Sequence, residues 1–384
     1  METEVSTFSM PSPLLPPLSR REWLALLSAS MALPAFPAFA ATAPAHAAGL
    51  LTAWVSGSDN QAWAGVWHIG SAPRGLALPN RVHEVQMLHN ALGQPTQALA
   101  VARRPGEFLL RFDIHSARAV QWHDIEDDRV LCGHAAFAHD GSVLYTTETS
   151  TETGAGFIAV RDPVSLEKLR EFSSGGLDPH AVMVEPDGSL LVANGGLLNL
   201  PETGRVKLNR AQMDSSLARL DPTTGEQRQA WRVNDPFLSL RHLARAADDT
   251  IAVAMQAEHA DAAARRTAPL LALLDKSGLR TVALPDALAL GGYAGDVAYV
   301  PGRNAQTADR FVISATRAGQ LAWWSAQGDT PQQLALPEAG ALAVHGADWL
   351  ASGAQGCVRG EMEDHALEQQ LRNVRWDNHG KWLA

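Results

Sequence analysis

Histidines recur along this chain at positions where their side chains can converge. His83, His134, His180 and His242 each stand at the start of a short apolar run, and these runs return about every 50 residues. Neutral imidazoles that converge on one point bind copper, zinc or iron. We therefore take His134, His180 and His242 as candidate ligands of a transition metal, iron or copper, although the cationic Arg241 beside His242 disfavours a divalent ion.

The same histidines have a structural interpretation, in which each ring hydrogen-bonds to the backbone of a neighbouring repeat. No closely spaced metal motif supports the metal hypothesis, because the chain has no H-E-x-x-H and only two Cys. It also lacks a P-loop and a dinucleotide-binding glycine motif between a strand and a helix. The metal hypothesis thus depends on convergence alone.

A polar excursion at residues 194–217 is the second candidate site. Arg205 and Lys207 can hold a carboxylate or a phosphate, or they can pair with Glu148 and Asp214. The glycines of the excursion permit close backbone approach. The structural alternative is an ordered loop whose polar groups satisfy one another. The candidate binding residues are Glu148, Asn194, Gly195, Gly196, Arg205, Lys207, Asn209, Arg241 and Gln256.

The elements that position these residues repeat along the chain. Short β-branched or aromatic runs alternate with Gly, Pro, Asp and Asn, and helical periodicity is nearly absent after the first 47 residues. In the unit that holds His134, we expect strands at Ala135–Ala138, Val143–Thr147, Gly156–Arg161 and Leu166–Phe172. Four strands in a unit of about 50 residues are typical of a β-propeller, with a sandwich or a β-helix as the alternative.

Six such units follow one another from His83 onward, and residues 50–78 supply three further strands without an inner one. The segment Arg375–His379 can provide the missing inner strand. We therefore expect an all-β fold, a seven-bladed β-propeller of four-stranded blades whose ring is closed by the N- and C-terminal strands. Closure of this kind removes free sheet edges. The candidate residues are then expected to line one mouth of a central channel.

Charge and the first residues indicate the compartment. The formal charge is −10 with no run of Lys or Arg, which argues against nucleic acid as a partner. Arg20-Arg21, the Ala-rich segment after them and Ala45-His46-Ala47 resemble a twin-arginine export signal with its cleavage site. We therefore expect a signal peptide at 1–47, one propeller domain at 48–384 and a periplasmic location with no stable membrane span. A membrane anchor is the alternative.

The two cysteines, Cys132 and Cys357, stand in distant segments. An oxidising compartment permits a disulfide between them, whereas two buried thiols are the other possibility. The sequence leaves both open.

Five stretches resemble one bacterial protein family. They are GHAAFAHDGSVLYTTE, DPHAVMVEPDGSLLVANGG, TGRVKLNRAQMDSSL, LSLRHLA and the terminal WDNH. Through them the chain resembles the domain-of-unknown-function 1513 family (DUF1513) of exported proteins with a quinoprotein-like, WD40/YVTN-like propeller. The resemblance implies a periplasmic setting beside imelysin-type and di-haem proteins, which is linked to iron uptake. It implies no established activity.

The chain departs from the family's pattern at several polar positions. Ala181 stands where the family usually has Glu, and Leu200 where it usually has His. Thr149-Ser150 replaces Asn-Asp, and Met255-Gln256-Ala257 replaces Tyr-Gln-Gly. Because Glu, Asp and His are potential ligands, the resemblance implies a weakened or retuned site here.

Three functions are compatible with these observations. The first is a periplasmic protein that binds a small anionic ligand or a protein partner at the excursion, accessory to iron or other metal acquisition and without turnover. The second is a metal-dependent oxidoreductase or hydrolase that uses the histidines with Glu148 as acid or base. The third is a scaffold that uses its blade edges.

Overall fold

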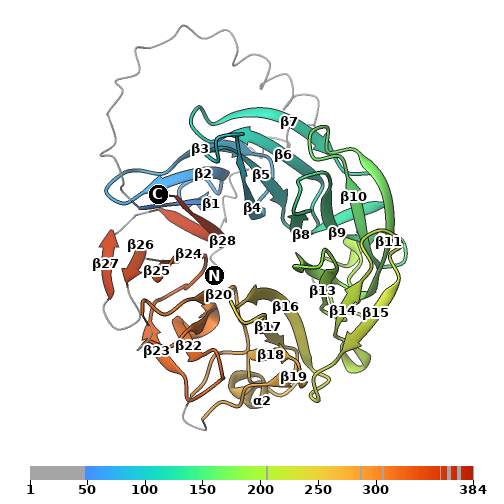
Figure 1. Ribbon diagram of the computed structural model, residues 1–384, viewed down its shortest axis with the longest axis vertical. Helices are drawn as coiled ribbons and strands as arrows, with labels where there is room; N and C mark the ends of the chain where they lie inside the picture. The colour runs from blue at the N-terminus through green and yellow to red at the C-terminus, as the bar shows by residue number, and fades with distance from the viewer. Residues whose placement is uncertain are drawn as a thin grey trace, which may run out of the picture. The chain divides into compact units, whose positions relative to one another are not determined.

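The computed structural model describes residues 48–204, 206–285, 288–304, 307–354, 356–360, 365–369 and 373–383. The predicted export signal at 1–47 and the candidate residue Arg205 lie outside the described residues. The described strands form four-stranded antiparallel sheets, which stand as blades around a central channel (Figure 1).

Three consecutive blades contain most of the candidate residues. The first is β4 (Val82–His89), β5 (Pro95–Ala102), β6 (Phe108–Asp113) and β7 (Arg118–Asp124). The second is β8 (Arg129–Phe137), β9 (Leu144–Ser150), β10 (Ala155–Arg161) and β11 (Lys168–Leu177). The third is β12 (Pro179–Val184), β13 (Leu190–Asn194), β14 (Ser216–Leu220) and β15 (Gln227–Trp231).

Three more blades continue the ring. The fourth is β16 (Leu238–Arg245), β17 (Ile251–Ala257), β18 (Leu271–Asp275) and β19 (Gly278–Thr281). The fifth is β20 (Val297–Val300), β21 (Arg310–Ala315), β22 (Gln320–Ser325) and β23 (Gln332–Ala335). The sixth is β24 (Leu342–His345), β25 (Asp348–Gly353), β26 (Gly356–Gly360) and β27 (His365–Gln369).

The remaining sheet is assembled from two distant parts of the chain. Its strands are β1 (Gly49–Ser56), β2 (Ala62–His68), β3 (Arg74–Leu78) and β28 (Val374–Leu383), and β28 pairs antiparallel with β1. We expected a ring of seven blades. The structure instead has six blades that are continuous four-strand units, together with one composite sheet in which strands from both ends of the domain pair. The reason is that residues 48–78 lack an inner strand, so the backbone groups of β1 must pair with a strand from the other end of the domain.

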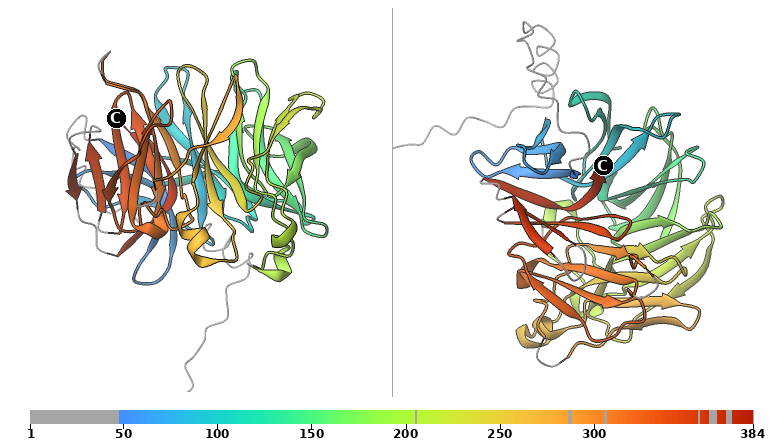
Figure 2. Two further views of the ribbon diagram at one scale, coloured as in Figure 1. Left: turned by 90° about the horizontal axis from the view of Figure 1, so that it is seen from below. Right: turned by 60° about the vertical axis from the view of Figure 1, so that its left-hand side comes forward.

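The inner strands form a ring of their own. Each first strand of a continuous blade, together with β28, contacts the inner strands of the two neighbouring sheets. The second strands of the blades are the most buried, as in β9 and β13, where every residue is buried. The outermost strands β7 and β15 are largely exposed. The apolar core therefore lies between the blades, and polar side chains are among those that line the channel. Figure 2 shows the blades of the ring in two further views.

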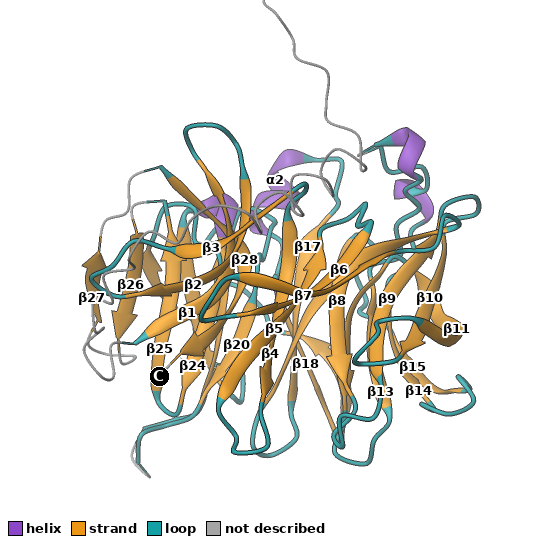
Figure 3. Ribbon diagram, turned by 90° about the horizontal axis from the view of Figure 1, so that it is seen from above, coloured by secondary structure: helices purple, strands orange, loops and turns teal. Residues whose placement is uncertain are grey.

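Within the described residues, each short helix lies in one kind of connection, from the second to the third strand of a blade. The helical turns η2 (Pro201–Thr203) and η3 (Arg210–Gln212) lie between β13 and β14. The helix α2 (Ala262–Thr267) lies between β17 and β18. Figure 3 shows these helices on one side of the ring. The excursion at 194–217 is thus an enlarged second-to-third-strand connection of the third blade, and not a continuation of an inner strand.

Candidate functional site

Breaks in strand pairing turn the histidines into the channel. The ladders skip from Val82 to Glu84, from Leu131 to Ala135, and from Pro179 to Ala181, so that His83, His134 and His180 fall within the irregular positions. In β16 the same kind of break falls just before His242. A bulge re-aims side chains and sharpens local twist. The histidines therefore lie within the inner strands and their rings meet in the channel, as the repeat pattern predicted.

A fifth histidine joins these four. His379 comes from β28, the inner strand of the composite sheet, and it is 7% exposed. The sequence analysis predicted that Arg375–His379 forms an inner strand, but it assigned no role to His379. The signal was available, because an inner-strand His of the last sheet faces the same channel as those of the other blades.

The five imidazole rings pack edge-to-face or tilted, with three rings in a layer and one ring on either side of it. Ring centres in the layer are separated by 4.8 Å (His83–His134), 5.2 Å (His134–His242) and 5.9 Å (His83–His242). His379 lies 4.8, 4.7 and 4.6 Å from these three rings, and His180 lies 5.3, 5.0 and 4.7 Å from them. The rings of His83, His134 and His242 thus belong to two groups of four, one completed by His379 and the other by His180.

These ring separations match a four-imidazole metal site. Metal–nitrogen bonds of about 2.1 Å in a tetrahedral site place the centres of four imidazoles about 5 Å apart. One ring nitrogen from each of His83, His134, His180 and His242 lies within 4.8 Å of the others. Ligand nitrogens of a tetrahedral site with such bonds lie about 3.4 Å apart, so these rings would have to move inward by an ångström or so to hold an ion.

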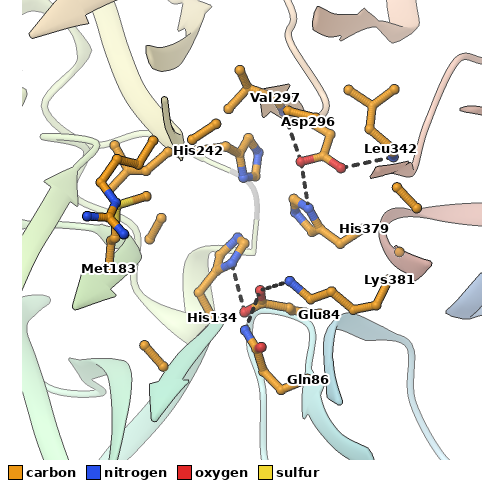
Figure 4. A pocket seen from close by; sticks show the side chains of 18 of the residues that line it. Glu84, Gln86, His134, Met183, His242, Asp296, Val297, Leu342, His379 and Lys381 are labelled. Carbon is orange, nitrogen blue, oxygen red and sulfur yellow. Dashed lines mark hydrogen bonds and ion pairs between the residues drawn. The ribbon is translucent and has the colours of Figure 1, made fainter. Parts of the chain in front are cut away.

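Two carboxylates orient rings in the cluster. His134 Nδ1 lies 3.1 Å from Glu84 Oε2, and His379 Nδ1 lies 3.0 Å from Asp296 Oδ1. Because a carboxylate accepts hydrogen bonds, each Nδ1 donates and each Nε2 is turned toward the other rings. A carboxylate behind a histidine is the usual second partner of a metal-bound imidazole. Figure 4 shows His134, His242 and His379 directed toward one another.

Several ring nitrogens in the cluster have no hydrogen-bond partner among the described residues. They are His83 Nδ1, His134 Nε2, His379 Nε2 and both nitrogens of His242. Buried polar atoms are paired in the great majority of cases, because an unpaired one costs about 1–3 kcal/mol. Such a concentration of unpaired nitrogens at one point indicates a ligand position.

Burial keeps most of these rings neutral. It lowers the pKa of His83, His180 and His242 well below the ordinary histidine value, and neighbouring cationic or imidazole groups add to the effect. Burial also lowers the pKa of His134, against the opposing influence of Glu84. The pKa of His379 is raised, because the Asp296 carboxylate outweighs the effect of burial. Neutral imidazoles are the form that binds metals.

A cavity of about 690 Å³ opens on one side of the cluster. We call it the funnel. His134, His242 and His379 lie at its floor with Glu84 and Asp296, and its walls are the later residues of the inner strands. His83 and His180 do not line it. The two sides of the cluster therefore differ, with the funnel on the side of His379 and the excursion on the side of His180.

The side away from the funnel is closed by an ion-pair network. Arg241 Nη1 lies 2.7 Å from Asp178 Oδ2, and the same carboxylate group pairs with Arg104. Arg241 also lies 3.3 Å from His180 Nδ1. A Cβ at Gly195 would lie 2.6 Å from Asp178 Oδ2 and 2.9 Å from Arg241 Cζ, so glycine leaves the space that this pair occupies.

The polar groups of the excursion satisfy one another. Asn209 accepts from the Leu198 amide at 2.7 Å and donates to the Gly196 carbonyl at 2.9 Å. Lys207 pairs with the buried Glu258, not with Glu148 or Asp214 as the sequence had suggested. Asp214 instead pairs with Arg232 at 2.6 Å. Binding of an anion by these residues stays a prediction.

Three further candidate binding residues make contacts that are typical of a structural role. Glu148 is fully buried and pairs with Arg161 at 2.8 Å, away from the channel lining, so it does not face the cavity as expected. Asn194 is buried and donates to the Ser174 carbonyl at 3.0 Å. Gln256 is half-buried in β17 and forms an isolated backbone bridge with Tyr293.

The cysteines do not add to the site in the part of the chain described. Cys132 is a buried free thiol, 2.9 Å from Thr149 Oγ1. Burial raises its pKa to about 11. The side chain of Cys357 lies outside what the structure describes, so the disulfide question stays open.

Fold and site together define the class: a β-propeller whose channel is lined by a buried imidazole cluster. The chain belongs to the family described as Protein of unknown function (DUF1513), whose model matches residues 76–383. No curated protein matches the chain. Within the described residues, no helix has the length and apolar character needed to cross a membrane.

Proposed function

We propose that this protein is an exported, quinoprotein-like propeller that binds one transition-metal ion in its channel. It would serve as a binding component beside a periplasmic metal-acquisition system. The observation that carries the proposal is the group of buried imidazole nitrogens without partners, two of whose rings are held by carboxylates. The twin-arginine pattern and the resemblance to iron-associated exported proteins support the location.

The site favours binding over turnover. His134, His242 and His379 offer buried imidazole nitrogens without partners among the described residues, with Glu84 and Asp296 behind two of the rings. Glu148, the acid or base of the enzyme hypothesis, is sealed against Arg161.

The donor type narrows the choice of metal. Imidazole suits copper, zinc, iron and nickel, and affinities of a given site for divalent ions peak at Cu(II). We therefore expect Cu(II) to bind most tightly in solution. Iron is the physiological ion to test first, because the resemblance is linked to iron uptake.

The test is a metal titration of the chelator-treated protein. Cu(II), Zn(II) and Fe(II) are added separately, and elemental analysis gives the bound stoichiometry. We expect one ion per chain, with affinity reduced at least about tenfold in His134→Ala and in His242→Ala. The matched control is His115→Ala, which changes an exposed histidine outside the channel. Absence of stoichiometric binding for all three ions overturns the proposal.

A second candidate ligand is a small anion at the excursion side. There, three buried carboxylates are each shared by two cations, in the sets Asp178 with Arg104 and Arg241, Asp377 with Arg81 and Arg103, and Glu258 with Lys207 and Arg210. This excess of positive charge contrasts with the net charge of −10. A cavity of about 370 Å³ beside Arg104 and Lys207 offers the space.

Calorimetric titration with phosphate and with citrate tests the anion site. We expect Lys207→Met to weaken binding of the better probe about tenfold, because a charge-assisted contact is lost. Exposed Arg118→Met on β7 is the control, since it removes the same charge elsewhere. No heat of binding for either probe contradicts this second function.

A further inference from the structure

The cluster contains two places for one ion. The layer of His83, His134 and His242 is completed to a four-ring group either by His379 or by His180. The two groups share three rings, so both cannot be filled at once. Ring separations are similar on both sides, whereas the ring nitrogens that lie within 4.8 Å of one another are those of His83, His134, His180 and His242, without His379. The hydrogen bonds of the two outer rings decide which of these nitrogens carry a lone pair for an ion.

His379 presents a lone pair to the layer. Its Nδ1 hydrogen-bonds to Asp296 at 3.0 Å, and its Nε2 has no partner in the described part of the chain. Asp296 is itself fixed, since it accepts from the backbone amides of Val297 at 2.9 Å and Leu342 at 3.0 Å. The ring is thus held with Nε2 toward the layer, which is the arrangement of a metal ligand.

His180 presents a hydrogen instead. Arg241 Nη1 lies 3.3 Å from His180 Nδ1, and a guanidinium can only donate, so Nδ1 must accept. A neutral imidazole that accepts at Nδ1 carries its hydrogen on Nε2. His180 Nε2 lies 3.4 Å from His83 Nε2 and donates to it. In this tautomer His180 has no lone pair for an ion, and the single lone pair of His83, on Nε2, is used by the same hydrogen bond.

Arg241 is held firmly in this position. It is 6% exposed and pairs at 2.7 Å with Asp178, which is 1% exposed. Arg104 binds the other oxygen of Asp178, and the absence of a Cβ at Gly195 leaves room for the pair. The guanidinium also places a fixed positive charge on this side, which repels a cation.

We propose that Arg241 is the residue that selects the position of the bound ion, by holding His180 as a hydrogen donor to His83 so that the ion is bound on the funnel side by His134, His242 and His379. This rests on the proposed metal-binding function. Loss of the Arg241 contact frees His180 and His83 to change tautomer and opens the four-imidazole position of His83, His134, His180 and His242. Arg241 is therefore a positioning residue, and His180 is a latent ligand.

The decisive experiment is a rescue, with Cu(II) dissociation constants as the readout. His379→Ala weakens binding at least about tenfold, whereas His180→Ala changes it less than about threefold. Adding Arg241→Met to His379→Ala restores affinity, because His180 and His83 become ligands beside His134 and His242. Adding His180→Ala as a third change abolishes that rescue. The visible spectrum of bound Co(II) changes between the wild type and the rescued variant, because the ligand set differs.

A control variant distinguishes the effect of the His180 tautomer from the effect of removing a positive charge. Arg103→Met removes a cation that also acts on the cluster, but Arg103 pairs with Asp377 and not with His180. Combined with His379→Ala, it is expected to give no rescue. Rescue by Arg103→Met, or its absence with Arg241→Met, overturns the proposal. If Arg241→Met does not fold, Asp178→Asn loosens the same contact at its anchor.

Two outcomes in the wild-type background are informative without any arginine variant. A loss of at least about tenfold in His180→Ala makes His180 a resident ligand and overturns the selection by Arg241. Failure of the wild type to bind any metal overturns the proposed function itself, and with it this inference. The two failures are therefore distinguishable.

Discussion

The imidazole cluster and the excursion lie on the same channel, and both are rich in polar groups, but their hydrogen bonding is opposite. In the cluster, His134, His242 and His379 keep buried nitrogens without partners among the described residues. In the excursion, Asn209 uses both ends of its amide within the loop, and Lys207 is paired with Glu258. Unpaired buried groups indicate a place for a ligand, whereas paired ones indicate structure.

This contrast gives a general expectation for substitutions. Changes in the cluster should alter metal affinity and leave stability nearly unchanged, because few native contacts are lost. Changes in the internally paired regions should lower stability and leave metal affinity unchanged. The following predictions test the contrast, beginning with the largest expected effect.

Glu148→Ala should lower the unfolding free energy by about 3–5 kcal/mol, because it leaves the buried Arg161 without its buried partner. Metal affinity should not change, since Glu148 does not line the funnel. Urea denaturation and Cu(II) titration measure the two quantities. The control is Glu152→Ala, an exposed residue in the same blade. Reduced metal affinity in the folded variant would return Glu148 to the list of site residues.

Asp296→Asn should lower metal affinity about 10- to 100-fold, because the carboxylate behind His379 orients its ring. The loss corresponds to about 1.4–2.8 kcal/mol of binding free energy. Competition with a chromogenic chelator measures it, and exposed Asp59→Asn serves as the control. Unchanged affinity would mean that His379 is not a ligand.

Asn209→Ala should lower the unfolding free energy by about 1–2 kcal/mol, because two hydrogen bonds inside the excursion are lost. Metal affinity should stay the same. Thermal unfolding measures the loss, with the exposed Gln212→Ala in the same excursion as the control. If Asn209→Ala weakened capture of phosphate or citrate without a change in stability, the excursion would be a binding site and not a packed loop.

Cys132 should be almost unreactive at pH 8, because burial raises the pKa of its thiol to about 11 and it lies against Thr149. The folded pKa lies above the ordinary value of 9.0, so the stabilising effect is complete below pH 9 and is lost as the pH rises through about 11. Peptide mass spectrometry after iodoacetamide treatment at pH 8 and pH 10.5 measures this. Rapid alkylation at pH 8 would show that the second blade opens locally.

Much of the architecture could be read from local pattern. The repeated apolar run that begins at each histidine located the inner strands, because residues at the same place in a repeat occupy the same place in the ring. The segment around His379 was recognised as an inner strand, although its histidine was not assigned to the site. Strand bounds were less accurate: β8 begins at Arg129, well before the expected Ala135, because the strand continues through the irregularity at His134.

The pairings of charged groups could not be predicted. Lys207 with Glu258, Glu148 with Arg161 and Arg241 with Asp178 each join different strands or blades. Opposite charges are abundant in the chain, and many pairs are compatible with the same repeat pattern. Which pair forms depends on the direction in which each strand leaves the channel.

The amino-acid sequence by itself determined the repeat, the strand-rich fold and the return of histidine at the inner strands, because these follow from local composition and spacing. Only the tertiary structure decided that five rings meet as a shared layer with His379 and His180 on opposite sides. It also decided that a carboxylate lies behind one and a guanidinium beside the other. The reason is that ring closure brings together residues about 200 to 300 positions apart, and no local pattern encodes their mutual orientation.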